Sequence, residues 1–353
     1  MSKETMTPKE RWEAVLAGQT PDRVPMDYWG TSETTQMLIT HFQKEPLEIA
    51  KTLHIDLPFS ASAKYIGPTI PQREDVFGIQ YRAIDYGYGS YSEVISSPLS
   101  EYQSVEEIEK NYTWPRADWW ETSTVAESIL LHSEWPLRVG GSEPMLTYKN
   151  LRGEAQAMMD LVLYPEIAHY CLEKLFDLAY ERTSRLYEAL PVGTKPTFTY
   201  VAEDLGSQKN LMYSPEHIRE FLFPGMKRMI DLAHEAGAAV FHHDDGNIMQ
   251  ILPELVDLGI DILNPIQWRA DNMDRQRLKK EYGDKLVFHG AVDNQHTLPF
   301  GTPRDVQDEV LENIDILGEN GGYILAPCHN IQPNTPLENI LMLYQTGYEA
   351  GFY

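Results

Sequence analysis

The stretch Ala238-Ala239-Val240-Phe241-His242-His243-Asp244-Asp245-Gly246-Asn247 indicates how this chain folds. Its first half is a short apolar run of the kind that forms a buried strand. Its second half holds two histidines and two aspartates, followed by a glycine and an asparagine. Polar chemistry is therefore concentrated where the predicted strand ends.

Other short apolar runs end in the same way. We predict strands over 197–202, 260–263, 286–288 and 322–326, and each is followed at once by carboxylates, imidazoles, amides or a thiol. The polar residues in these exits include Glu203, Asn264, Gln267, Asp293, Cys328 and His329. Further upstream, we predict that residues 135–144 form a strand and its exit loop. The short segment 26–30 is also a predicted strand, and it brings Asp27, Tyr28 and Trp29 to the same face.

Helical segments separate these strands. Periodic apolar residues and Ser-Pro or Thr-Pro starts predict helices that begin at Ser214, Thr302 and Thr335. Alternating strands and helices are typical of parallel βα units. We therefore predict an α/β fold, a single (β/α)8 TIM barrel over residues 1–353, with an aromatic-rich insertion of loops and hairpins at about 64–125. An open doubly wound sheet is the alternative, although no Gly-x-Gly-x-x-Gly segment follows a strand.

In a closed barrel the carboxyl ends of all strands meet on one face. Polar residues spread over more than a hundred positions would then line one pocket. No His-x-x-x-His or Cys-x-x-Cys spacing occurs, so any metal site depends on the barrel to bring its ligands together.

The composition of the chain indicates which classes of partner and which cellular compartment to expect. The chain has 353 residues and a formal charge of −24, which disfavours binding to nucleic acid or to anionic membranes. Two cysteines, Cys171 and Cys328, leave no room for a disulfide framework, and no apolar stretch is long enough to span a bilayer. We expect a cytoplasmic protein that binds a small molecule, with a homodimer as a possible assembly.

Several segments, taken together and in order, resemble the uroporphyrinogen decarboxylase superfamily, whose fold is one (β/α)8 barrel. They are Thr20–Pro25, Ala202–Gly206, His243–Asn247, Asn264-Pro265, Gly290–Asp293 and Cys328–Ile331. True uroporphyrinogen decarboxylases carry an arginine-rich segment after the first strand, where a substrate with many carboxylates needs cationic partners. Here the corresponding stretch, Asp27–Glu33, contains no arginine.

The resemblance is therefore closer to the cobalamin-dependent methyltransferase branch, which implies a zinc ion and a corrinoid carried by a partner protein. The metal pattern of that branch is His-x-Cys-Gly plus a distant cysteine. In this chain His243 takes the histidine position, Asp245 stands where the cysteine would be, and Cys328 or its neighbour His329 is the last ligand. Glu203 is a further carboxylate that could complete the zinc site.

The resemblance implies the following roles. The expected metal ligands are His243, Cys328, Asp245 and Glu203; the expected catalytic residues are Glu203, His329 and Asp27; the expected substrate-binding residues are Tyr28, Trp29, Asn264, Gln267 and Asp293. We predict a zinc-dependent methyltransferase that moves a methyl group from a small methyl ether or methylamine to a corrinoid protein, or from that protein to a thiol. One alternative is metal-free decarboxylation of a porphyrinogen-like or other cyclic carboxylic acid. Another is a non-catalytic partner of a corrinoid protein.

Overall fold

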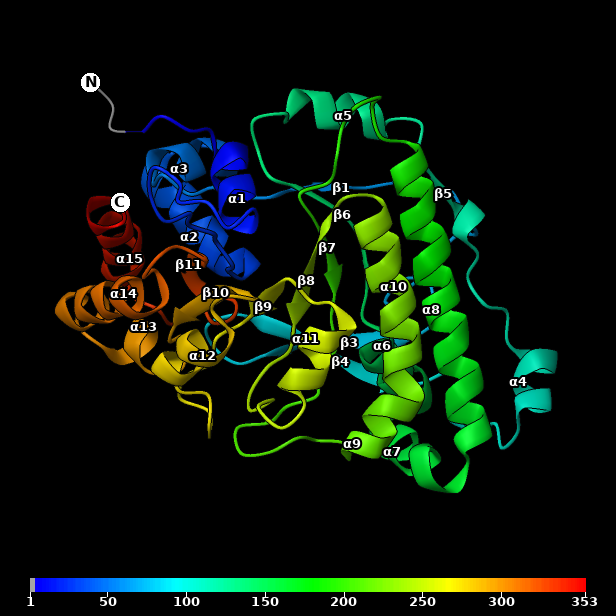
Figure 1. The fold of residues 1–353 in the computed structure, drawn as a ribbon. Coiled ribbons are helices and arrows are strands. Elements are labelled where there is room, and N and C mark those ends of the chain that lie inside the picture. The colour runs from blue at the N-terminus through cyan, green and yellow to red at the C-terminus, as the bar shows by residue number, and fades with distance from the viewer. Residues whose placement is uncertain (1–3) are drawn as a thin grey trace.

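A curled parallel sheet of seven strands forms the centre of the computed structural model, which describes residues 4–353 (Figure 1). The strands are hydrogen-bonded in the order β1-β6-β7-β8-β9-β10-β11, and every neighbouring pair is parallel. Their bounds are β1 Phe59–Ala61, β6 Leu137–Ser142, β7 Phe198–Val201, β8 Ala239–His243, β9 Ile262–Asn264, β10 Val287–Val292 and β11 Tyr323–Pro327. The predicted α/β fold with parallel strands is thus confirmed.

Helices connect these strands and cover the outside of the sheet, with α8 and α10 packed side by side over β6 to β8 (Figure 1). The helices of this half and of the C-terminal half are α6 Pro144–Arg152, α7 Glu154–Leu163, α8 Pro165–Glu188, α9 Pro215–His217, α10 Phe223–Glu235, α11 Leu252–Leu258, α12 Arg275–Tyr282, α13 Thr297–Phe300, α14 Pro303–Leu317 and α15 Leu337–Ala350. Within residues 4–353, no helix combines the length and apolarity needed to span a bilayer.

Local sequence explains where these helices begin. Thr302 caps α14 in a capping box with Asp305, and the helix buries Val306, Val310 and Leu317. The helix predicted from Ser214 onward is instead interrupted by a π-helical turn, η2 Ile218–Leu222, between α9 and α10. Pro224 follows this turn and has no N–H to donate, so the regular α-helical hydrogen-bond pattern cannot run through it.

The predicted first strand, 26–30, is reduced to isolated parallel bridges, Met26 to Leu325 and Gly30 to Ile331. Around Met26 the backbone nevertheless bonds on both sides. Asp27 N donates to Leu325 O, and Leu325 N donates to Pro25 O. On the other side, Asp56 N donates to Met26 O just before β1. The sheet therefore has seven regular strands, and the segment around Met26 lies between its first and last members.

Helix α1 Pro8–Leu16 packs at the amino-terminal end of the strands. Its Trp12 is fully buried and stacks on Phe198 of β7 at 5.3 Å between ring centroids. Together with Phe241, Ile262 and Ile324, these side chains fill the interior of the curled sheet. The opposite end, where the polar strand exits lie, is left for a site.

The aromatic-rich insertion forms two small antiparallel sheets and short helices rather than hairpins alone. Its elements are β2 Lys64–Tyr65, β3 Gln80–Asp85, β4 Ser90–Ser96, α4 Val105–Asn111, η1 Ala117–Trp119, β5 Trp120–Glu121 and α5 Val125–Leu131. The β3–β4 hairpin reaches the carboxyl-terminal side of the sheet, where Ser90 N donates to Glu33 and Tyr86 OH donates to Gln332. Glu33 belongs to α2 Ser32–Phe42, which is followed by α3 Pro46–Thr52.

Candidate metal centre at the carboxyl ends of the strands

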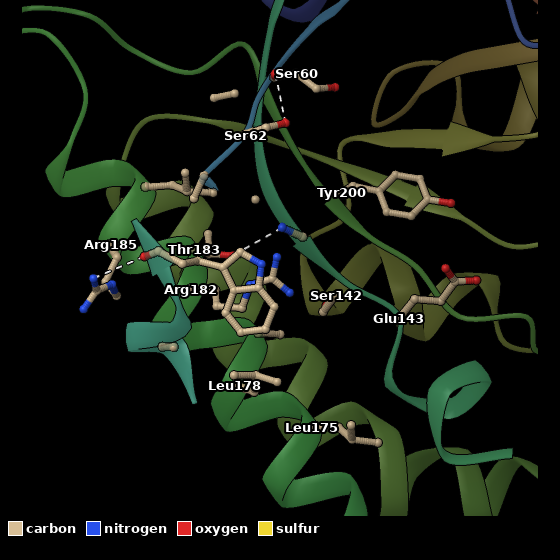
Figure 2. Close-up of a pocket in the computed structure, with 18 of the residues that line it drawn as sticks. Ser60, Ser62, Ser142, Glu143, Leu175, Leu178, Arg182, Thr183, Arg185 and Tyr200 are labelled. Atoms are coloured by element: carbon tan, nitrogen blue, oxygen red, sulfur yellow. Dashed lines mark hydrogen bonds between the residues drawn. The ribbon is translucent and has the colours of Figure 1, made fainter. Parts of the chain in front are cut away.

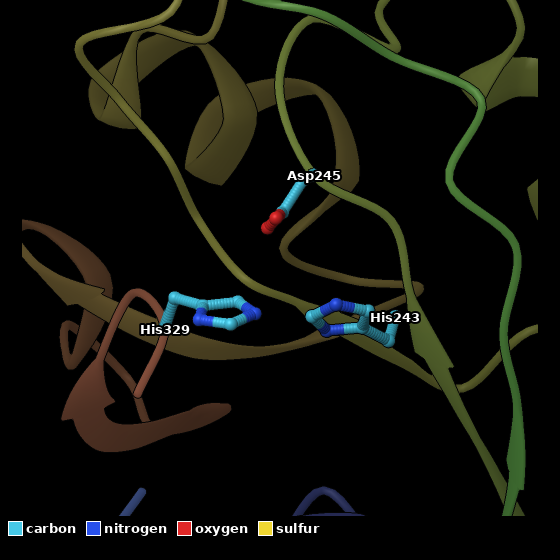
Figure 3. A group of neighbouring side chains, drawn as sticks. All are labelled: His243, Asp245 and His329. Carbon is cyan, nitrogen blue, oxygen red and sulfur yellow. The ribbon is translucent and has the colours of Figure 1, made fainter. Parts of the chain in front are cut away.

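Three side chains from distant parts of the chain point toward one another at the carboxyl end of the sheet (Figure 3). They are His243 at the end of β8, Asp245 in the loop after it, and His329 after β11. One ligand atom from each lies within 4.8 Å of the other two, and His243 is only 5% exposed. Two imidazoles and a carboxylate therefore converge as the parallel strands predict.

A directed chain of hydrogen bonds fixes the tautomer of His243. His243 Nδ1 donates to Asn264 Oδ1 at 2.6 Å, and Asn264 Nδ2 donates to His289 Nδ1 at 2.7 Å. His289 Nε2 then donates to Asp27 Oδ2 at 3.1 Å. Because an amide nitrogen can only donate and a carboxylate only accept, each ring proton in this chain has one position. His243 Nε2 is left with a lone pair that faces Asp245 and His329.

Asp27 accepts the last hydrogen bond of this series, from His289. It is 2% exposed, its Oδ2 also accepts from Trp29 Nε1 at 2.9 Å, and its Oδ1 accepts from Tyr28 N at 2.7 Å. The structure thus places Asp27 behind His289 rather than beside the three converging ligands. Trp29 lies closer to them, because its ring stacks on that of His243 at 5.5 Å.

Tyr28 points elsewhere. Its hydroxyl is 3.0 Å from Thr35 Oγ1 and its ring packs against Tyr344. Of the aromatic pair predicted to contact substrate, only Trp29 therefore has a ring beside the converging imidazoles, with His329 at 6.5 Å in an edge orientation.

Gln267 orients Asp245. Its Nε2 donates to Asp245 Oδ1 at 2.8 Å, and its Oε1 accepts from Gly246 N at 2.8 Å. Gly246 has φ +82°, and a Cβ there would overlap the Ser207 carbonyl oxygen, so the turn that carries Asp245 back toward His243 requires glycine. Burial raises the pKa of Asp245 and lowers the pKa of His329, while their mutual attraction opposes both shifts. Burial thus favours a His329 ring with a lone pair to offer.

The two acids that follow β7 have different places. Glu203 is fully buried, its Oε2 accepts from Met145 N at 3.1 Å, and burial raises its pKa well above the ordinary value. Asp204 Oδ1 instead lies 3.9 Å from His243 Nε2, and it is buried with no hydrogen-bond partner within the described residues. Among the same described residues Glu203 Oε1 is also buried without a partner, so it is the distance to His243 Nε2 that marks Asp204 as the second carboxylate beside this imidazole. The sequence points to the pair but cannot tell which of two adjacent side chains faces His243.

Cys328 and Asp293 are engaged elsewhere. The Cys328 thiol donates to Ile266 O at 3.3 Å, and burial raises its pKa well above the ordinary value. Asp293 Oδ2 pairs with Arg269 Nε at 2.5 Å, and Asp293 Oδ1 accepts from Gln295 N. Neither side chain belongs to the group of ligand atoms around His243.

Two residues at this end of the sheet, Asp204 and Glu143, were not among the predicted site residues. Glu143 follows β6, and burial together with the nearby Asp204 carboxylate raises its pKa. Its Gly-Gly-Ser-Glu context, without an apolar run directly before the acid, gave only a weak signal. The site therefore holds more acid than was predicted, with Asp204, Glu143 and Asp245 around two imidazoles.

Comparison with known proteins finds a family whose sequence pattern this chain matches. The sequence profile of the family described as uroporphyrinogen decarboxylase (URO-D) matches residues 84–349. Uroporphyrinogen decarboxylase of Nostoc punctiforme is 25% identical over 195 residues, which cover 53% of this chain and 49% of that protein. Methylcobamide:CoM methyltransferase MtaA of Methanosarcina barkeri is 24% identical over 232 residues, covering 62% of this chain and 61% of that protein. The matched regions thus span about half to three fifths of these relatives.

A solved structure shares the overall fold. It is a methyltransferase from Methanosarcina mazei, which superposes with a TM-score of 0.69 at 20% sequence identity and covers 98% of this chain and 99% of that one. At this level of identity the match establishes the fold, and the activity has to be argued from the site.

Proposed function

This chain belongs to the uroporphyrinogen decarboxylase family, and from that premise we propose that it is a zinc-dependent methyltransferase. In this proposal it moves a methyl group between a small methylated compound and a corrinoid protein. The single observation that carries the proposal is the convergence of His243, Asp245 and His329 within 4.8 Å of one another. The similarity to a methylcobamide:CoM methyltransferase supports it.

The donor set fits a catalytic metal. Two imidazole nitrogens and one carboxylate are a known ligand set for catalytic zinc, and three protein ligands leave a fourth position for substrate. His243 offers Nε2 because Asn264 holds its other nitrogen, and Gln267 engages only one of the two carboxylate oxygens of Asp245. The buried, unpartnered Asp204 Oδ1 beside His243 is a further negative site that a cation would stabilise. Zinc bound here would act as a Lewis acid that polarises the heteroatom carrying the methyl group.

The protein's own residues prepare this position. A series of hydrogen bonds holds the His243 imidazole in one tautomer and one orientation, and it runs through Asn264 and His289 to Asp27. Residues behind metal ligands generally act in this way. Stacked rings of Trp29 and Tyr200 cover His243 at 5.5 and 5.9 Å and limit the access of water. We further propose that Pro25–Asp27 takes the place of an eighth strand and closes the barrel. The site would then be surrounded by strands on all sides.

Acid–base decarboxylation is the second candidate, and the similarity to uroporphyrinogen decarboxylases over about half of the chain favours it. In that case His329 and Asp204 would handle protons without a metal. Against it stands the entrance segment 27–33, which offers no arginine to a polycarboxylate. Asp27 is also fully occupied by donors.

An assay separates the two candidates. The zinc-loaded protein is mixed with free methylcobalamin and a panel of thiols, and in the reverse direction with reduced cobalamin and methyl ethers, while the absorbance of the cobalt–carbon bond is followed. We expect methyl transfer in at least one direction, and its loss in His243→Ala. Release of carbon dioxide from uroporphyrinogen by the zinc-free protein, without any change in cobalamin absorbance, would instead establish decarboxylation.

A further inference from the structure

A cavity of about 620 Å³ lies between helix α8, strands β1 and β6, and the short strand β5 (Figure 2). Arg182, Thr183 and Arg185 line it from α8, while Ser142 and Glu143 line it from the end of β6. Among all its lining residues there are three arginines and one carboxylate. Basic residues thus outnumber acidic ones in the lining of this cavity, whereas in the whole sequence 53 acidic residues outnumber 29 basic ones.

The three arginines of this cavity are half-buried, and they differ in their partners from the fully buried arginines of the described chain. The four buried ones each have a carboxylate oxygen at 2.7 to 2.9 Å, in the pairs Arg11–Asp22, Arg23–Asp56, Arg152–Asp160 and Arg275–Glu312. Burying a guanidinium without a counter-ion is costly, so this pairing is what a stable fold requires. An arginine that lines a cavity without such a partner leaves a charge for something else to neutralise.

Arg138 and Arg182 are in that position. Across residues 4–353 neither forms an ion pair, and each only lies over an aromatic ring. The Arg182 guanidinium carbon is 3.9 Å from the centre of the Trp120 ring, and that of Arg138 is 4.3 Å from the Tyr200 ring. These contacts hold the guanidinium planes in place while leaving their edges, which carry the donors, uncommitted. Burial lowers the pKa of both groups; at Arg138 the Asp27 and Glu143 carboxylates oppose this shift, whereas burial acts alone at Arg182.

Two more polar atoms at the cavity lack partners. Ser142 is 6% exposed, and its Oγ has no hydrogen-bond partner within the described chain. The same holds for Arg185 Nε, although another nitrogen of Arg185 donates to Trp120 O at 3.3 Å. Since buried polar groups are nearly always hydrogen-bonded, orphaned donors around one cavity indicate a ligand that accepts from them.

We propose that this cavity binds the anionic head of a small organic molecule, a carboxylate or a phosphate, with Arg138 and Arg182 as its counter-ions. Guanidinium groups match both head groups, since two parallel N–H donors fit two oxygens. Ser142 and Arg185 supply further donors around the same space.

The cavity adjoins the candidate metal centre. Tyr200 lies under Arg138 and also stacks on His243 at 5.9 Å, and Glu143 lines the cavity while lying close enough to Asp204 for the two carboxylates to interact. A ligand held at Arg138 would therefore extend along Tyr200 toward His243. In this reading the methylated substrate is an organic anion rather than a methylammonium cation, a step that rests on the proposed function.

Isothermal titration calorimetry tests the site without any methyl transfer. The probes are benzoate, phenyl phosphate and the neutral benzamide, each titrated at the same ionic strength into the full-length protein. We expect at least one anionic probe to bind with a dissociation constant of about 1 mM or tighter, and benzamide to bind at least about tenfold more weakly. Whichever of benzoate and phenyl phosphate binds more tightly indicates whether the natural ligand carries a carboxylate or a phosphate. Equal binding of benzoate and benzamide, or no binding of either anion, would overturn the proposal without any variant being needed.

Substitutions then locate the binding. Arg138→Gln on β6 and Arg182→Gln on α8 should each weaken the anionic probe about tenfold or more. Lys174→Gln, which removes a cation held over the Tyr170 ring of the same helix but outside this cavity, is the matched control and should leave binding unchanged. The titrations follow binding alone and need no methyl transfer, so failure of the methyl-transfer proposal and failure of this one are distinguishable. Binding that survives both arginine substitutions in folded protein would contradict the assignment.

Discussion

Replacing Asn264 tests whether the hydrogen bonds behind His243 matter for zinc affinity, and not only for the stability of the fold. It joins His243 to His289 with two buried hydrogen bonds, of 2.6 and 2.7 Å. In Asn264→Leu, which has a similar shape, the His243 Nδ1–H and the His289 Nδ1 lone pair are both left without partners. Each unpaired buried group costs about 1–3 kcal/mol, so for two such groups we expect the free energy of unfolding to fall by about 2–6 kcal/mol.

The effect on metal binding is a separate quantity. Without Asn264 the imidazole of His243 can rotate and change tautomer, and loss of such a supporting contact typically weakens metal affinity by about 10–100-fold. Zinc affinity is measured by competition with a chromogenic chelator, and stability by urea unfolding of the zinc-free protein. Asn264→Asp keeps an acceptor for His243 and should retain nearly the wild-type affinity.

Asn339→Leu supplies the matched control. Asn339 is also fully buried, and its amide donates to Leu298 O and Gly301 O at 2.8 Å each, away from the metal centre. It should lower stability by a similar amount and leave zinc affinity unchanged. Wild-type zinc affinity in a folded Asn264→Leu protein would refute the claim that the chain of hydrogen bonds orients His243.

Two further predictions concern the scaffold. Burial opposes ionisation of Asp22, but hydrogen bonds from Arg11 and from two backbone N–H groups lower its pKa to about 2 from the ordinary 3.8. Asp22→Asn should therefore cost about 1 kcal/mol at pH 7, and this difference should shrink as the pH falls below about 4 and be largely lost by about pH 2, which urea unfolding at several pH values checks; a difference at pH 2 as large as that at pH 7 contradicts it. Trp12→Ala removes the buried ring that stacks on Phe198 and should lower the free energy of unfolding by about 3–5 kcal/mol; a loss below about 1 kcal/mol in the same measurement would show that α1 does not support the sheet interior.

The strands that carry the site were predictable because each combines an apolar run with a polar exit, as residues 239–245 do. Strand β1, Phe59–Ala61, was missed because three residues after a proline give no periodicity to detect. The predicted first strand over 26–30 has the right neighbours, but it bonds through isolated bridges, a distinction of backbone geometry that composition does not encode.

The sequence predicts where the site lies, at the exits of several strands, but it does not predict which side chains contact one another there. His243, Asp245 and His329 follow from the exits together with the family resemblance. Whether Glu203 or Asp204 faces His243 depends on the local path of the backbone, and only the structure shows that Asp204 does. The orienting role of Asn264 likewise depends on a distance between two strands that no spacing in the sequence reveals.

The most direct test of the metal centre is the zinc content of the purified protein, measured by elemental analysis after reconstitution and removal of excess metal. The proposed ligand set predicts about one zinc per chain, lost in His243→Ala and His329→Ala. It also predicts that Cys328→Ser keeps its zinc, because the thiol donates to Ile266 O rather than toward the cluster. Loss of zinc in Cys328→Ser with retention in His329→Ala would contradict the ligand set, and no zinc in the reconstituted wild-type protein would contradict the metal centre itself.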